Sequence, residues 1–360
     1  MDTKSFCAQR KYPCLDLWRL LVLALIPMVA IPSEARGQDK LRVITTLPTY
    51  AAITRQISGD HASVEAIARG DEDPHFVNPR PSYAAKVQRA DMFVATGLDL
   101  ELWVPAVLNR ANNARVADGS PGNVVAYAGV RLLDVPENVS RSGGDVHVFG
   151  NPHIHTDPIN GIQIARNIAN GLKRVDPENA SDYDINLAAF ERTLLERLYG
   201  EELVEMLGAE TILELARNYG FWDFLQGQQY QGRALKDFLG GWMAEASVVR
   251  GKRMVCYHKN WTYFSARFGT ECAMYVEPQP GIPPSPGHVR DVVEFIEAED
   301  IQVLLAANYF RRSQVEQVAS RTGATPVVVP EHVEGEEGVN DYFELIDTWI
   351  ARISAAYGVE

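Results

Sequence analysis

Three histidines and one glutamate form the most informative pattern in this chain. His75, His153 and His258 lie far apart in the sequence, and each follows a segment predicted to be a strand or a turn into a helix. Glu331 follows the last apolar run of the chain in the same way. Three imidazoles and one carboxylate make a set that can be tetrahedral, which suits zinc better than calcium or magnesium. The pattern therefore predicts a metal site closed by distant parts of the chain.

The second histidine lies in the segment 151–158, which carries several polar side chains. If this segment is extended, His153 and His155 face the same way and both could bind a metal; in a tight turn only one could, and we favour His153. Asp157 precedes a proline, so it fits a helix cap, or an acceptor for the second N–H of a metal-bound imidazole, better than a ligand. His147 and His155 are secondary candidates.

Two residues compete for the fourth place in the site. Glu331 follows the predicted strand Pro326–Val329, and His332 is its immediate neighbour. The sequence leaves both open, and a water molecule is a further alternative. The histidines at the remaining two positions of interest, His61 and His288, are predicted to be ordinary surface residues.

Short apolar runs and helical segments alternate in two parts of the chain, which predicts parallel sheets. In the first part the predicted elements are, in order, Leu41–Thr46, Tyr50–Gly59, Val64–Ala68, Pro81–Ala90 and Met92–Thr96. In the second part they are Arg253–Tyr257, Thr262–Phe268, Ala273–Val276, Arg290–Ala298, Val303–Ala306, Ser313–Thr322 and Pro326–Val329. The predicted fold is α/β, with two lobes that each contain a parallel sheet flanked by helices. His75 and His258 then lie beyond the carboxyl ends of strands, where open α/β sheets bind ligands.

A single long helix is predicted to join the two lobes. It starts near Asp176-Pro177, and its apolar residues recur every three to four positions. The predicted domains are an N-terminal metal-binding lobe over 38–177, a linker helix over 178–218 and a C-terminal metal-binding lobe over 219–360. An aromatic-rich insertion over 219–242 is interpreted as extra helices that cover a core edge, which we favour, or as a docking surface.

Residues 1–37 have the pattern of a secretory signal peptide. Basic side chains precede or open an apolar run over Leu20–Ile31, and small residues follow it. A membrane-spanning helix needs about 20 apolar residues, so we favour a cleaved signal over the alternative of a membrane anchor. Cys7 and Cys14 precede the apolar run, where a lipid-modified cysteine cannot lie. The sequence thus predicts export to the periplasm.

Cys256 and Cys272 are the cysteines that remain after such processing. In an oxidising compartment they could form a disulfide, provided that their strands are adjacent and their side chains face each other. We favour two buried free thiols, and neither thiol is predicted to bind the metal.

Composition and missing motifs weigh against several classes of function. The formal net charge of -13 disfavours nucleic-acid binding. The sequence contains no glycine-rich phosphate loop, no His-Glu-x-x-His helix and no Gly-x-Ser-x-Gly elbow, which argues against common hydrolases. A zinc hydrolase with three histidines and a water in the fourth position remains an alternative.

Motifs along the chain, taken in order, resemble those of the periplasmic metal-binding proteins of ABC transporters, which capture zinc or manganese. They are Val43–Pro48, Asp73-Pro74-His75, Ala90–Val94 with Gly97, Asn151-Pro152-His153 with Asp157-Pro158, His258 with Tyr263-Phe264 and Gly269, and Glu277-Pro278. Together they cover nearly all of the chain after the signal peptide.

The resemblance implies two lobes joined by one long helix, with the metal between them. It implies His75, His153 and His258 as metal ligands, and Glu331 as a shifted match to the acidic fourth ligand of the family. The position of His155 usually holds an aromatic residue in the family. Manganese members tend to carry a glutamate in place of the third histidine, so His258 favours zinc.

The predicted function is therefore high-affinity capture of zinc in the periplasm and delivery to an ABC transporter permease in the inner membrane. The resemblance implies a monomer that carries the metal ion as cargo and has no enzymatic activity. A manganese- or iron-binding protein of the same transporter class is the main alternative. A zinc-dependent hydrolase and an adhesin-like or chaperone role are further ones.

Overall fold

The computed structural model describes residues 40–136, 147–277 and 281–358. The predicted signal peptide lies outside these residues. Lys40–Glu360 form one compact unit. In the described part of the chain, no helix is both long enough and apolar enough to cross a membrane.

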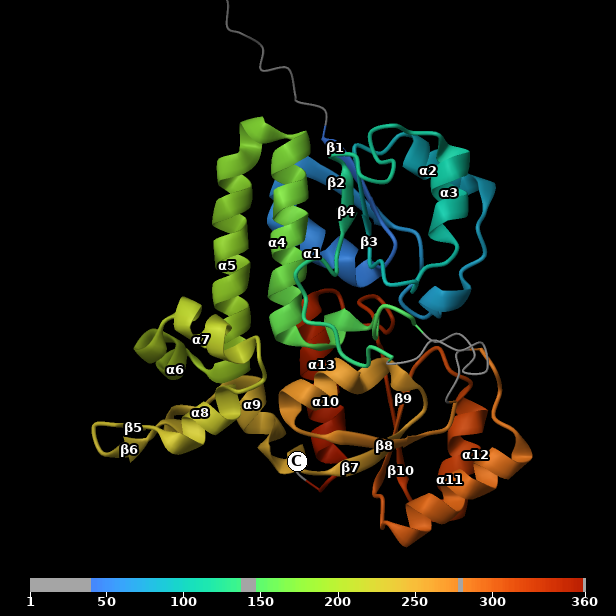
Figure 1. The fold of residues 1–360 in the computed structure, drawn as a ribbon, viewed down its shortest axis with the longest axis vertical. Coiled ribbons are helices and arrows are strands. Elements are labelled where there is room, and N and C mark those ends of the chain that lie inside the picture. The colour runs from blue at the N-terminus through green and yellow to red at the C-terminus, as the bar shows by residue number, and fades with distance from the viewer. Residues whose placement is uncertain (1–39, 137–146, 278–280, 359–360) are drawn as a thin grey trace, which may run out of the picture. The chain divides into compact units, whose positions relative to one another are not determined.

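The first sheet has four parallel strands in the order β2-β1-β3-β4 (Figure 1). The strands are β1 (Leu41–Thr45), β2 (Ala62–Ala66), β3 (Met92–Ala95) and β4 (Asn123–Val125). The helices between and after them are α1 (Pro48–Ser58), α2 (Pro81–Gln88), α3 (Val104–Ala111) and α4 (Pro158–Val175). The predicted parallel sheet is confirmed, whereas α3 and β4 were not predicted.

The second sheet also has four parallel strands, in the order β10-β9-β7-β8. The strands are β7 (Arg253–Cys256), β8 (Glu271–Tyr275), β9 (Val303–Ala307) and β10 (Thr325–Val329). The helices around them are α10 (Thr262–Phe268), α11 (Pro286–Ala298), α12 (Arg312–Thr322) and α13 (Tyr342–Ala355). Every residue of β9 is buried, as expected for a central parallel strand covered on both faces. The predicted α/β fold with two parallel sheets is confirmed.

The predicted linker helix over 178–218 is wrong in its second half. The structure divides this range into α5 (Ala180–Tyr199), α6 (Glu201–Leu207) and α7 (Ala209–Ala216). Gly200 and Gly208 separate these helices, with φ angles of 87° and 78°. A Cβ atom on Gly200 would lie 2.7 Å from the Cα of Gly240, so α5 ends at a position that only glycine can occupy.

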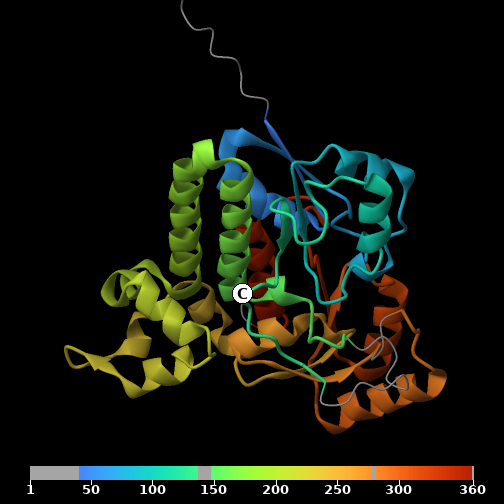
Figure 2. The ribbon, with the colours of Figure 1, turned by 45° about the horizontal axis from the view of Figure 1, so that its top comes forward.

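Helix α5 packs beside α4 in both views of the ribbon (Figures 1 and 2). It also contacts α1, which covers the first sheet, and the short helix α9 (Gly241–Glu245), which contacts α13 beside the second sheet. These contacts suit an element that connects the two sheets. The domain boundaries at 177 and 218 remain a prediction.

The aromatic-rich insertion contributes to the core. It contains α8 (Phe221–Gly227), α9 and a small antiparallel pair of strands, β5 (Gln229–Tyr230) and β6 (Arg233–Ala234). Phe221 is buried against Tyr199, with ring centroids 4.4 Å apart. The indole N–H of Trp242 donates to Asp347 at 2.7 Å. The favoured interpretation, helices that cover a core edge, agrees with this packing.

Cys256 and Cys272 form a disulfide, so the favoured prediction of two free thiols is wrong. Their strands, β7 and β8, are hydrogen-bonded neighbours, and the Cα atoms lie 5.5 Å apart. An irregularity in the pairing after Met254 changes the register there. The spacing of the cysteines in the sequence does not reveal that register.

Candidate metal centre

His75 and His153 are held by the same local arrangement. Oδ1 of Asp73 accepts the backbone N–H of His75 at 3.0 Å and lies 2.8 Å from Nδ1 of its ring. Oδ1 of Asn151 contacts the backbone N–H and Nδ1 of His153 at 3.0 Å each. Because both oxygens are acceptors, we assign the ring proton to Nδ1 in each histidine. The Nε2 atoms then keep their lone pairs for a metal.

His258 lies two residues after β7, and its ring contacts the backbone just beyond the end of the neighbouring strand β8. Its Nδ1 lies 2.9 Å from the backbone carbonyl oxygen of Glu277, which again places the ring proton on Nδ1. Nε2 of His258 and Nε2 of His153 are buried and have no hydrogen-bond partner among the described residues. All three predicted histidines therefore present an unprotonated nitrogen.

The rings of these histidines converge from different elements. The ring centroids of His75 and His153 lie 5.3 Å apart, those of His75 and His258 lie 6.0 Å apart, and those of His153 and His258 lie 6.1 Å apart. Imidazoles that bind one zinc at the usual bond length and the tetrahedral angle have centroids roughly 5 Å apart. A small inward movement would bring the three rings onto one ion.

The structure adds His147, which the sequence identified as a secondary candidate. Its Nε2 lies 3.2 Å from Nε2 of His75, and its ring centroid lies 6.2 Å from that of His153. His147 is less buried than His153. We call His75, His147, His153 and His258 the four-histidine cluster.

Glu331 lies beyond the carboxyl end of β10 and is completely buried. Its Oε1 lies 3.9 Å from Nε2 of His153 and 3.7 Å from Nε2 of His155. Its Oε2 accepts hydrogen bonds from Asn260, at 2.7 Å, and from the hydroxyl of Tyr309. These two donors were not predicted, because they come from separate turns and no local sequence pattern marks them.

His155 and His332 lie next to Glu331 and are not part of the four-histidine cluster. His153 precedes a 3-10 turn over Ile154–Thr156, which contains His155. Both rings approach Oε1 of Glu331, but the ring of His153 lies beside those of His75 and His258. The rings of His155 and His332 stack, with centroids 4.7 Å apart. We call His155, Glu331 and His332 the inner cluster.

Burial shifts the pKa values of several groups in the two clusters. It lowers the pKa of His258 to about 4 and, together with the neighbouring imidazoles, the pKa of His147 to about 3. Burial likewise lowers the pKa of His153 well below its usual value. The pKa of Glu331 is raised by burial to about 7. These imidazoles are therefore neutral near pH 7, which is the form that binds metal.

The other polar residues considered in the sequence have structural contacts. Asp157 caps α4, as predicted, by accepting the backbone N–H of Ile159 at 2.9 Å. It also pairs with Arg267. His61 pairs with Asp182, and Nε2 of His288 lies 2.9 Å from the carbonyl oxygen of Tyr275, so neither belongs to the clusters.

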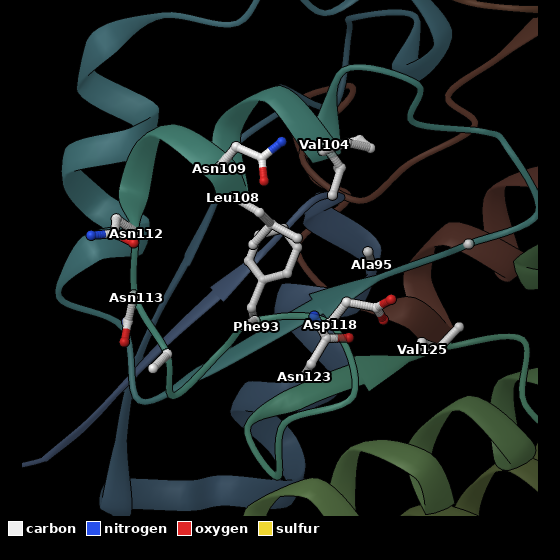
Figure 3. Close-up of a pocket in the computed structure, with 14 residues that line it drawn as sticks. Phe93, Ala95, Val104, Leu108, Asn109, Asn112, Asn113, Asp118, Asn123 and Val125 are labelled. Carbon is white, nitrogen blue, oxygen red and sulfur yellow. The ribbon is translucent and has the colours of Figure 1, made fainter.

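A hollow of about 580 Å³ lies elsewhere, beside β3, α3 and β4 (Figure 3). Its lining includes Phe93, Val104 and Leu108, and no histidine among the described residues. It carries no set of metal ligands.

The sequence matches the family described as zinc-uptake complex component A, periplasmic (ZnuA), over residues 43–200 and 233–356. The chain belongs to the ZnuA family. The residues of both clusters and both four-stranded sheets lie within the matched ranges, except for the first two residues of β1. The match leaves out the segment 201–232.

Two curated relatives come from Streptococcus pneumoniae. The zinc-binding lipoprotein AdcA is 25% identical over 345 residues, which cover 90% of this chain and 65% of AdcA. The manganese ABC transporter substrate-binding lipoprotein PsaA is 31% identical over 184 residues, which cover 50% of this chain and 56% of PsaA. The matches thus span less than two thirds of the length of these relatives.

Among solved structures, the crystal structure of ZnuA is similar with a TM-score of 0.63 and 20% sequence identity. The alignment covers 89% of this chain and all of that one. At this identity the likeness shows the fold, which agrees with the two parallel sheets.

Proposed function

We propose that this protein captures zinc in the periplasm and delivers it to an ABC transporter permease in the inner membrane. The observation that carries the proposal is the convergence of His75, His153 and His258, each with Nδ1 at an acceptor. Rings oriented in this way each direct Nε2 to the site, so a cation needs only the small inward movement described above. Such preorganisation favours tight binding.

The proposed ligands are His75, His153 and His258, with Glu331 as the fourth. Glu331 supplies a carboxylate oxygen, Oε1, that has no hydrogen-bond partner among the described residues. His147 is the competing fourth ligand, because its Nε2 approaches that of His75. Membership in the ZnuA family supports a role in zinc uptake, and the resemblance to the zinc-binding lipoprotein AdcA supports zinc binding.

Zinc is the proposed cargo because the ligand set is rich in nitrogen. Imidazoles favour zinc over manganese, which prefers oxygen ligands. The resemblance to PsaA makes manganese the alternative, and the four-histidine cluster argues against it. A cleaved signal over 1–37 and a monomeric state belong to the same proposal.

Elemental analysis of the protein purified from its own periplasm, without added metal, tests the cargo. We expect zinc, with at least one tightly held ion per chain. Manganese or iron in stoichiometric amount would overturn the choice of zinc. Incubation of the loaded protein with ester and phosphate substrates tests the hydrolase alternative, since turnover that His75→Ala abolishes would contradict a pure carrier.

A further inference from the structure

The inner cluster of His155, Glu331 and His332 has the composition and burial of a metal site of its own. All three side chains are completely buried. One ligand atom from each lies within 4.8 Å of the other two. Two imidazole nitrogens and one carboxylate oxygen form a ligand set that zinc uses with a water or a second oxygen in the fourth position.

Polar atoms of the inner cluster lack partners. Both ring nitrogens of His155, Nε2 of His332 and Oε1 of Glu331 are buried without a hydrogen bond among the described residues. Buried polar atoms are normally paired, because leaving one unpaired forfeits its hydration. One of these unpaired atoms from each residue can serve as a ligand, and a cation held by the three residues would supply the missing partner.

The backbone around the inner cluster is fixed. Tyr342 donates its hydroxyl to the carbonyl oxygen of His155 at 2.6 Å, and Trp349 donates its indole N–H to that of Pro330 at 2.5 Å. The backbone N–H of Val333 donates to Oγ1 of Thr49 at 3.3 Å. The turns that carry the three ligands are thus held without a metal, as in a preorganised site.

Glu331 connects the inner cluster to the four-histidine cluster. Its Oε1 faces both His153, at 3.9 Å, and His155, at 3.7 Å. Two ligand atoms of one zinc at the tetrahedral angle lie roughly 3.4 Å apart, so an ion between Glu331 and His155 needs only a small contraction. Metal ions in two-metal sites lie about 3.5–4 Å apart, a separation that one carboxylate can span.

We infer that His155, Glu331 and His332 form a second, enclosed transition-metal site, which shares Glu331 with the site proposed for the cargo. The inference rests on the proposed function only through Glu331. The ring nitrogens of His155 and His332 belong to the inner cluster alone.

The test measures zinc per chain. Metal-free protein is dialysed against excess zinc at pH 7.5, freed of loosely held ions and analysed by inductively coupled plasma mass spectrometry. We expect two zinc ions per wild-type chain and two binding phases in calorimetry. One zinc per wild-type chain at saturation would overturn the second site.

Two variants separate the sites. His332→Gln is expected to retain one zinc, with the remaining affinity within about tenfold of that of the first wild-type phase. His155→Phe, which keeps an aromatic ring of similar size, is expected to behave in the same way and covers the case in which His332→Gln does not fold. His288→Gln is the control, because His288 lies outside both clusters, and it should retain two.

Variants of the four-histidine cluster distinguish failure of this inference from failure of the proposed function. His258→Ala should lose one zinc and keep the ion of the inner cluster. Loss of both ions in folded His332→Gln or His155→Phe would show one composite site and overturn the inference, whatever the cargo. Anomalous scattering at the zinc edge from wild-type crystals would place the second ion beside His155 and His332, and its absence there at full loading would refute the assignment.

Discussion

Arg267 and Asp157 form a buried ion pair in which Nε and Nη2 each donate a hydrogen bond of 2.8 Å to a carboxylate oxygen. Asp157 begins α4, directly after the turn that carries His153 and His155, and Arg267 lies in α10, which follows His258. The pair therefore connects two of the segments that carry the proposed metal ligands.

Breaking this pair should destabilise the protein strongly. Arg267→Ala leaves a buried carboxylate without its partner, and we expect a loss of about 3–5 kcal/mol in the free energy of unfolding of the metal-free protein. Urea denaturation followed by circular dichroism measures it. Arg192→Ala, which removes an exposed pair with Glu196, is the matched control and should cost under about 1 kcal/mol. Equal losses in the two variants would contradict the structural role of Arg267.

Removing one imidazole should weaken zinc binding more than removing the carboxylate. His258→Ala removes one of the three proposed imidazole ligands, so we expect the dissociation constant of the first zinc to rise more than about 100-fold. Loss of a residue that only hydrogen-bonds to a ligand usually costs about 10- to 100-fold. Glu331→Ala should have a smaller effect, because His147 or water can take its place. Competition with a chromogenic chelator measures both. Equal losses would make Glu331 a full ligand, and an unchanged constant in His258→Ala would remove the core of the assignment.

The acceptor of a ligand's N–H should contribute to affinity without touching the metal. Asn151→Ala removes the oxygen that orients His153, and we expect zinc binding to weaken about 10- to 100-fold. Asn113→Ala is the matched control, because Asn113 bonds the backbone carbonyls of Val87 and Ala90 away from the site. If the two variants bind zinc equally well, orientation of His153 by Asn151 is unimportant.

The affinity for zinc should depend on pH through Glu331. Its pKa of about 7 in the metal-free protein means that the carboxyl is protonated at lower pH and must release a proton to bind the ion. Affinity should therefore fall as the pH drops below 7, by about tenfold per unit. His258, with its pKa lowered to about 4, adds no proton competition between pH 5.5 and 7.5.

Glu331→Gln provides the control for this pH dependence. The glutamine does not titrate, so the variant should bind more weakly at pH 7.5 but show a flatter profile down to pH 5.5. An unchanged slope in the variant would assign the dependence to other groups.

The fold and the candidate ligands His75 and His153 could be read from the sequence because their signals are local. Alternating apolar runs gave β1 and β9 nearly to the residue, and the X-Pro-His motifs marked His75 and His153. The sequence could not show that His153 and His155 belong to different clusters, because this depends on a single 3-10 turn. The pairing of Cys256 with Cys272 depends on strand register, which the sequence does not display.

The acceptors two residues before His75 and His153 have a consequence for unloading. In each case the acceptor oxygen fixes the orientation of the ring through Nδ1, so the ring cannot rotate away from a bound ion while its backbone stays in place. In the proposed carrier, release of the ion would therefore require whole segments of the chain to move apart. A permease that moves the Asp73–His75 turn away from Asn151–His153 would separate the proposed ligands. Each imidazole would keep its orientation for the next ion.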